Sequence, residues 1–160
     1  MDETEISDLR GEIYDVIKTI RDPEKPQTLE ELAVINEEDI SVKIDSKCSV
    51  VTIELTPTIP HCSLATILGL CVRTKLEKYW GKNIRHREST LSLLHIAVLI
   101  NNFYTACVFF AHLDVFLKEG THASVHEVSK QLNDKERVAA AMENPELREK
   151  VEECIKEDDG

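Results

Sequence analysis

The stretch that decides the fold is SVVTIELTPTIPHCSLATILGL, residues 49 to 70. Its first part, Ser49 to Leu55, carries apolar residues in alternation with polar ones and predicts a β-strand. The two prolines that follow keep the chain out of helical geometry until the second has passed. A helix is then expected to begin at Ser63 or Leu64 and to run to about Leu76. The stretch therefore predicts a strand joined to a helix by a stiff loop.

Cys62 is delivered by this loop to the first turn of the helix. Unpaired backbone N–H groups and the helix dipole at that position favour a thiolate. Cysteines so placed have lowered pKa values and are the reactive or metal-seeking ones. The alternative is a small buried residue that caps a core helix. His61 could stabilise the thiolate, but adjacent side chains in extended backbone point apart, so an ordinary turn histidine is an equally good interpretation.

Outward from this stretch, helical and alternating patterns follow one another along the chain. A helix is expected over 7–20, followed by a capping box at Thr28 to Glu31. Strands are expected over 40–44, with a turn at 45–47 after it, and over 113–117. Two helices are expected at the end of the chain, the first capped by Asn133 or Asp134 and the second by Asn144 before Pro145. The predicted fold class is α+β: a small, mostly antiparallel sheet with helices packed on it.

The composition limits the partners and the compartment. The chain has 160 residues, enough for one domain spanning 1–160, and a formal net charge of −11. An acidic balance argues against direct binding of nucleic acid or anionic lipid, both of which need basic surfaces. The N-terminus is acidic and lacks an early apolar run, so no signal peptide is expected. We expect a cytoplasmic protein that can also be nuclear.

The spacing of the cysteines matches neither a disulfide pattern nor a zinc-binding pattern. There are five, at positions 48, 62, 71, 107 and 154, with no CxxC pair. Their odd number and the expected reducing compartment argue against disulfides, and the missing paired spacings argue against a closed zinc site. Cys62 and Cys71 lie too far apart on one helix to bind a single ion together. Cys71 and Cys154 are interpreted as apolar-face residues.

One segment does not fit the pattern of a small domain. Residues 89 to 113 contain no Asp, Glu, Lys or Arg and are long enough to cross a bilayer. His95, Asn101 and Asn102 near the middle count against a membrane span, because polar side chains are costly in hydrocarbon. Both interpretations, a span and an apolar insertion, follow from the residues alone.

Four long strings carry a resemblance to a known family. They are IRDPEKPQTLEEL (20–32), TPTIPHCSLATILGLCVR (56–73), GTHAS (120–124) and KQLNDKERVAAAMENPELREKVEEC (130–154). The chain resembles the MIP18 family, which contains the domain of unknown function 59, and is most similar to its cytosolic iron–sulfur assembly component 2A branch. The resemblance covers nearly the whole chain except about 86–111. It implies that 86–111 is an insertion into a loop. The apolar residues of this segment would have to be buried either on the domain or against another copy of the chain, and a homo-oligomer is expected.

The resemblance also implies a function. Family members are adaptors, or targeting factors, that help deliver iron–sulfur clusters to apo-proteins in the cytosol, with an indirect role in chromosome segregation through their clients. The implied partners are a WD40 β-propeller subunit, iron–sulfur client proteins and, for some members, a HEAT-repeat protein. No cofactor is expected to bind stably, although an iron–sulfur cluster or metal ion would pass transiently.

The residues expected to carry this function surround Cys62, the functional thiol. His61, Thr121 and His122 are its candidate neighbours, and Cys62 and His122 are the candidate metal ligands. His122 can approach Cys62 only if the sheet places both at one edge. The signatures GxSxG, GxGxxG and HExxH and the P-loop are all absent, so no enzyme is expected. The alternative is a thiol-dependent enzyme, or a cluster or metal carrier, that uses Cys62.

Overall fold

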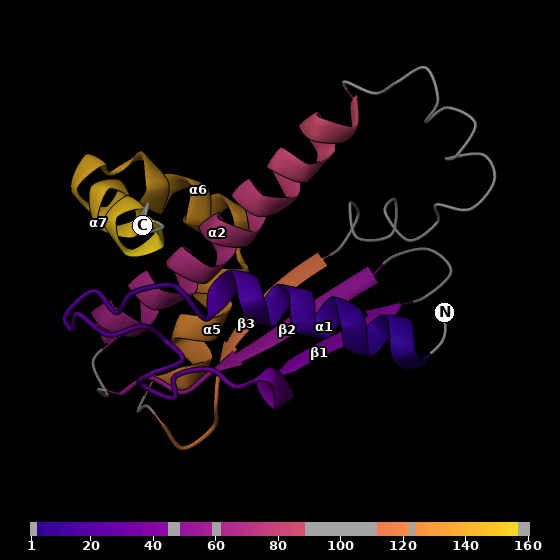
Figure 1. Ribbon diagram of the computed structural model, residues 1–160. Helices are drawn as coiled ribbons and strands as arrows, with labels where there is room; N and C mark the ends of the chain where they lie inside the picture. The colour runs from indigo at the N-terminus through magenta and orange to yellow at the C-terminus, as the bar shows by residue number, and fades with distance from the viewer. Residues whose placement is uncertain (1–2, 45–48, 59–61, 89–111, 122–123, 157–160) are drawn as a thin grey trace.

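The computed structural model describes residues 3–44, 49–58, 62–88, 112–121 and 124–156. Its elements are α1 (Glu3–Ile17), the short 3₁₀ turn η1 (Glu37–Asp39), β1 (Ile40–Ile44), β2 (Ser49–Leu55), α2 (Cys62–Glu88), β3 (His112–Leu117), α5 (Val125–Asn133), α6 (Lys135–Glu143) and α7 (Pro145–Ile155). The predicted α+β class, with helices packed on a small sheet, is confirmed (Figure 1).

The sheet has the strand order β1-β2-β3. Strands β1 and β2 pair antiparallel, with Val42 opposite Val51, as expected for neighbours joined by a short turn. Strands β2 and β3 pair parallel, with Ile53 opposite Val115. Parallel neighbours need a long crossover connection, and helix α2 lies in that connection. The sequence pattern located the three strands but did not reveal this parallel pairing.

The two faces of the sheet differ in burial. The face covered by helices carries the alternate apolar residues of all three strands: Ile40, Val42, Val51, Ile53, Leu55, Leu113, Val115 and Leu117. The residues between them point to the other face, where Lys43, Glu54 and Phe116 are exposed. Each apolar side chain that is fully buried contributes about 1.5–3 kcal/mol, so the covered face holds much of the folding free energy.

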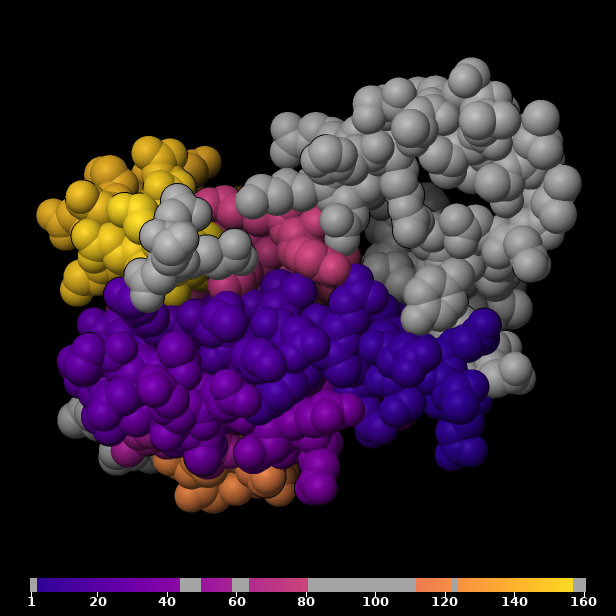
Figure 2. Space-filling view, in the orientation of Figure 1, coloured from indigo at the N-terminus to yellow at the C-terminus, as the bar shows by residue number. Residues whose placement is uncertain are grey.

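Helix α1 covers the sheet with one apolar stripe. Leu9, Ile13 and Ile17 recur four residues apart and are buried. The helix ends at Ile17, earlier than the predicted Ile20, because the chain turns there: the N–H of Ile20 bonds to the Ile17 carbonyl over 3.1 Å. Ile20 is still fully buried. Figure 2 shows that α1 and the chain following it form most of one face of the molecule.

The capping box predicted after α1 is present. The backbone N–H of Thr28 donates to the Glu31 carboxylate over 2.8 Å, and the Glu31 N–H donates to the Thr28 hydroxyl over 3.3 Å. The N–H of Leu32 bonds to the Thr28 carbonyl, which closes a single turn rather than a helix. This turn brings Val34 and Ile35 into the core.

Helix α2 is longer than predicted, because it continues past Leu76 to Glu88. Beyond Leu76 the residues remain good helix formers, but Glu77 and Lys78 are exposed, so the apolar periodicity that marks a packed helix fades. The predicted insertion 86–111 begins inside the last turn of α2. Its remainder, residues 89–111, lies outside the described residues.

The last two helices begin where their caps predict. The side chain of Asp134 accepts hydrogen bonds from the N–H groups of Glu136 and Arg137, and α6 follows. Asn144 caps α7 in the same way, with Pro145 as its first residue. Helix α7 buries Val151 and Cys154 against α2, away from the sheet (Figure 1).

Helix α5 closes the outer edge of β3. The Asn133 side chain accepts from the N–H of Val115 over 2.8 Å and donates to its carbonyl over 3.1 Å. The Ser129 hydroxyl accepts from the N–H of Leu117 over 3.1 Å. Side chains therefore take the place of a fourth strand and leave β3 without a free edge at these positions.

Among the described residues, no helix combines the length and the apolar character needed to cross a membrane. The uncharged segment that raised this question lies almost wholly in 89–111, outside the described residues, so the choice between insertion and membrane span stays a prediction.

Candidate functional site at one edge of the sheet

The parallel pairing of β2 and β3 fixes where the candidate site lies. Leu55, the last residue of β2, is opposite Leu117, the last residue of β3. The chain that follows β2 leads to Cys62, and the chain that follows β3 leads to His122. Both segments therefore leave the sheet at the same edge, which meets the condition for an approach of these two residues.

Backbone hydrogen bonds hold the segments at this edge together. The N–H of Lys118 donates to the Leu55 carbonyl over 2.8 Å. The N–H of Thr56 donates to the Val34 carbonyl, also over 2.8 Å. Pro57 is buried directly after it. The start of the loop that carries Cys62 is thus anchored on both sides.

Cys62 is the first residue of helix α2. The prediction that it lies in the first turn of a helix is confirmed, so its backbone surroundings are those that favour a thiolate. His61 and His122 lie outside the described residues. Whether either ring contacts the thiol stays a prediction.

Thr121, the third candidate neighbour, takes part in a tight turn. Its hydroxyl donates to the Lys118 carbonyl over 2.6 Å. Gly120, just before it, has a φ of +83°, a conformation that favours glycine. The structure therefore gives Thr121 a role in shaping the turn that precedes His122.

An ion pair that the sequence reasoning missed also lies at this edge. Lys118 Nζ bonds to the Asp39 carboxylate over 3.0 Å. Burial raises the pKa of Asp39, but hydrogen bonds from Lys118 and Asn36 outweigh it and hold that pKa below its usual value. The pair joins the turn before β1 to the end of β3. No local pattern signalled it, because the two residues are far apart in the sequence.

Arg73, in the string GLCVR, is a second residue whose role the sequence did not reveal. It is 6% exposed, and its guanidinium donates to the Leu113 carbonyl over 2.8 Å and to Asn133 over 3.2 Å. Burial lowers its pKa. Arg73 joins α2 to β3 and α5, so the string that carries the family resemblance also carries a structural contact of the core.

Cys71 and Cys154 are buried, which confirms their interpretation as apolar-face residues. Their thiols are hydrogen-bonded to each other across α2 and α7. This bond and burial raise the pKa of Cys71, while the bond lowers the pKa of Cys154. Cys71 cannot bind the same ion as Cys62, because it lies two and a half turns further along α2.

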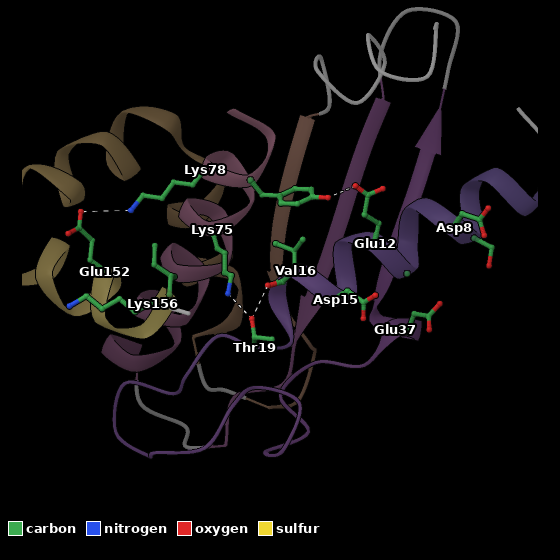
Figure 3. A pocket seen from close by; sticks show the side chains of 14 residues that line it. Asp8, Glu12, Asp15, Val16, Thr19, Glu37, Lys75, Lys78, Glu152 and Lys156 are labelled. Carbon is green, nitrogen blue, oxygen red and sulfur yellow. Dashed lines mark hydrogen bonds and ion pairs between the residues drawn. The ribbon is translucent and has the colours of Figure 1, made fainter. Parts of the chain in front are cut away.

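A groove of about 1230 Å³ lies between α1, α2 and α7 (Figure 3). Its facing polar groups are largely paired: Lys75 donates to Thr19 over 2.7 Å, Tyr79 to Glu12 over 2.5 Å, and Lys78 faces Glu152 at 3.9 Å. Lys75 is about 20 Å along α2 from Cys62 at the usual rise per residue. At Lys75 the groove therefore lies far from Cys62.

Within the described ranges, no group of three or more His, Cys, Asp or Glu residues is arranged to hold a metal ion. This finding does not reach the candidate pair Cys62 and His122, because the Cys62 side chain and the whole of His122 lie outside what the structure describes.

Comparisons with known proteins show the family of the chain. Residues 10–85 match the family model described as iron–sulfur cluster assembly protein. The chain is 34% identical over 165 residues to MIP18 family protein FAM96A of Dictyostelium discoideum, covering 92% of each chain. The chain belongs to the MIP18 family. The predicted family is thereby confirmed, and the match ends at Arg85, next to the start of the predicted insertion.

Two further relatives place this MIP18 family member among longer proteins. It is 44% identical over 155 residues to MIP18 family protein galla-1 of Drosophila melanogaster, covering 96% of this chain and 59% of galla-1. It is 40% identical over 144 residues to cytosolic iron–sulfur assembly component 2B of Mus musculus, covering 90% of this chain and 71% of that protein. The chain thus spans about three fifths of galla-1. Its assignment to the 2A branch stays a prediction.

Proposed function

We propose that this MIP18 protein is a non-enzymatic adaptor of cytosolic iron–sulfur protein assembly that helps deliver clusters to apo-proteins. The observation that carries the proposal is its membership of a family that includes a cytosolic iron–sulfur assembly component. The matched family model, that of an iron–sulfur cluster assembly protein, supports the same role. An indirect effect on chromosome segregation would follow through client proteins.

The adaptor acts through Cys62 at the start of α2. The backbone of a helix N-terminus favours a thiolate, which is the form that binds iron or zinc. One cysteine supplies only one ligand, so a cluster or metal ion would need further ligands from His122 or from another subunit. The cluster is therefore proposed as transient cargo and not as a resident cofactor.

The proposed partners are a WD40 β-propeller subunit of the assembly machinery, iron–sulfur client proteins and a HEAT-repeat protein. The proposed location is the cytoplasm, with access to the nucleus, and the proposed state is a homo-oligomer. Direct binding of nucleic acid is not expected from a chain with a net charge of −11.

The second candidate function is a thiol-dependent enzyme, or a cluster or metal carrier, that uses Cys62. The position of Cys62 at a helix N-terminus favours this second function as much as the adaptor, since nucleophilic thiols are activated there. The chain has no sequence motif for an oxyanion hole, so this candidate ranks second.

Affinity capture of the tagged full chain from a cell extract separates the two candidates. The adaptor predicts recovery of the β-propeller subunit together with iron–sulfur client enzymes. If the capture recovers neither, while the purified protein turns over a thioester or disulfide substrate in a Cys62-dependent way, the thiol enzyme is the better account.

A further inference from the structure

A second groove, of about 1150 Å³, lies where the uncovered face of the sheet meets α5. Its lining comes from both sides: Glu54, Asp114 and Phe116 from the strands, and Val125, His126 and Lys130 from α5. We call it the Phe116 groove. Figure 1 shows α5 beside β3, so the groove runs along the last two strands and the helix next to them.

Phe116 is the most informative residue of this groove. Its side chain is 38% exposed, and it is the one large hydrophobic residue found exposed among the described residues. The neighbouring Leu117 is buried in the core, whereas the Phe116 ring leaves apolar surface within the groove that a partner can cover. Exposed aromatic rings of this kind are typical of anchor points in protein interfaces.

Two carboxylates flank the ring on the same face. Glu54 is the register partner of Phe116 in the parallel pair, which places their Cβ atoms about 5 Å apart. Asp114 precedes Phe116 by two residues on β3 and so points to the same face, about 7 Å away. The ring therefore lies next to two negative charges.

These two carboxylates make no hydrogen bond and no close ion pair within the described part of the chain. Their charges act on described cations, that of Glu54 on Lys118 and that of Asp114 on Arg73. Lys118 itself is bonded to Asp39, and Asp134 caps α6. Lys130 on α5 is a cation at the far side of the groove. The charge left around Phe116 is thus negative on the strand side.

The backbone of the groove is closed to an added strand. The outer N–H groups of Val115 and Leu117 already donate to side chains of α5, so an extended peptide cannot pair with β3 at these positions. A partner in this groove must therefore be recognised through its side chains.

We propose that the Phe116 groove receives an arginine side chain of a partner protein. A guanidinium is planar and weakly hydrated, so it stacks on an aromatic face while donating to carboxylates on either side. Lysine satisfies this arrangement less well, because its ammonium is compact and strongly hydrated. An acidic segment would be repelled by Glu54 and Asp114, and a purely apolar segment would bury these carboxylates without a hydrogen bond.

The groove also has a defined place relative to the candidate site. Phe116 lies two residues before Lys118, which is bonded to Leu55 at the edge that leads to Cys62. A partner bound through its arginine would therefore lie beside that edge. The inference depends on the groove alone and would stand if the proposed function failed.

The test is an NMR titration of the ¹⁵N-labelled full chain with capped peptides. The probe is acetyl-Gly-Leu-Arg-Leu-Gly-amide, and its matched controls carry lysine, citrulline or glutamate in place of arginine. We expect saturable shifts at the amides of Glu54, 114–118 and 126–130 with the arginine peptide, and a dissociation constant on the order of millimolar for one anchoring side chain. Citrulline, which keeps the shape but lacks the charge, should bind about tenfold more weakly or not at all.

Variants then assign the binding to the proposed residues. Phe116→Ser, and separately the pair Glu54→Gln and Asp114→Asn, should each weaken binding of the arginine peptide by about tenfold. The matched control is Glu127→Gln with Glu146→Gln, which removes the same charge from exposed positions outside the groove. A thermal melt of each variant shows that the fold is kept.

The proposal is overturned if no saturable shift occurs, if citrulline or glutamate binds as well as arginine, or if the folded variants bind like the wild type.

Discussion

The backbone N–H of Lys118 donates a hydrogen bond to the carbonyl of Leu55 over 2.8 Å. This bond extends the parallel pairing by one step beyond the ends of β2 and β3. It holds the start of the loop that leads to Cys62 beside the start of the turn that leads to His122. A stable β-pairing therefore brings together two segments that are more than fifty residues apart in the sequence.

The first prediction concerns the thiol of Cys62. We expect its alkylation by iodoacetamide to titrate at a lower pH than that of an ordinary cysteine, because the start of α2 favours the thiolate and lowers the pKa of the thiol. Cys71 should react far more slowly, since it is fully buried and its pKa is raised. The measurement is the modified fraction of each cysteine by mass spectrometry across pH 5 to 9. A Cys62 midpoint equal to that of the urea-unfolded chain would show that the helix does not activate it.

The second prediction concerns the contact between α2 and α5. A Cβ built on Gly69 would lie 2.3 Å from a methyl carbon of Leu132, a residue that is itself 1% exposed. Overpacking of this kind costs about 1–3 kcal/mol, while alanine gains about 1 kcal/mol over glycine in a helix. We therefore expect Gly69→Ala to lower the free energy of unfolding by up to about 2 kcal/mol in urea titrations.

A matched control is available in α1. Gly11 has no atom within 4 Å of its Cβ position, so Gly11→Ala should raise stability by about 0.5–1 kcal/mol. In a Leu132→Ala background the clash is removed, and Gly69→Ala should no longer destabilise. If Gly69→Ala costs the same in both backgrounds, the close contact does not cause the effect.

The third prediction concerns the ion pair between Asp39 and Lys118. Because the folded-state pKa of Asp39 is lowered, its carboxylate contributes stability above the unfolded value of about 3.9, and this contribution is lost as the pH falls through the folded value. Asp39→Asn should cost about 1 kcal/mol at pH 7, since Lys118 is half exposed. The difference between variant and wild type should shrink as the pH falls from 5 to 3.

Urea titrations at several pH values measure this difference. Glu24→Gln, at an exposed position, is the control that changes charge without removing the pair. An Asp39→Asn penalty that stays constant down to pH 3 would mean that the ionised carboxylate is not what stabilises the fold.

The fourth prediction concerns residues 86–111. If they are an insertion, a chain in which Arg85 is joined directly to His112 should be less prone to self-association, because contiguous apolar residues promote it. This shortened chain should still bind the β-propeller partner. Light scattering and affinity capture make the comparison. Carbonate-resistant membrane association of the full chain, lost on the deletion, would support the membrane span instead.

The sequence predicted the elements of the fold well, because their signals are local. The caps at Asp134 and Asn144, the box at Thr28 and the three strands all follow from residues within one or two turns of each other. Helix α2 was predicted too short, since the apolar periodicity fades after Leu76, where Glu77 and Lys78 are exposed. Local patterns could not reveal the parallel pairing of β2 and β3, because it joins residues more than fifty positions apart in the sequence.

The candidate site was predicted only in part, because only some of its signals are local. The placement of Cys62 at a helix start follows from the two prolines and the helical pattern around it. The contacts that hold the edge, from Lys118 to Leu55 and to Asp39, join residues distant in the sequence, and no spacing signals them. The buried bonds of Arg73 were missed similarly, because an arginine on a helix is expected to be solvated.

The central claim is that this MIP18 protein supports iron–sulfur protein assembly through Cys62. The most direct measurement is radioactive iron incorporated into cytosolic iron–sulfur proteins in cells depleted of the endogenous protein. We predict that the full chain and its Cys48→Ser variant restore incorporation, while Cys62→Ser, although folded and expressed at the same level, does not. Restoration by Cys62→Ser would contradict the role of the thiol, and unchanged incorporation in depleted cells would contradict the proposed function itself.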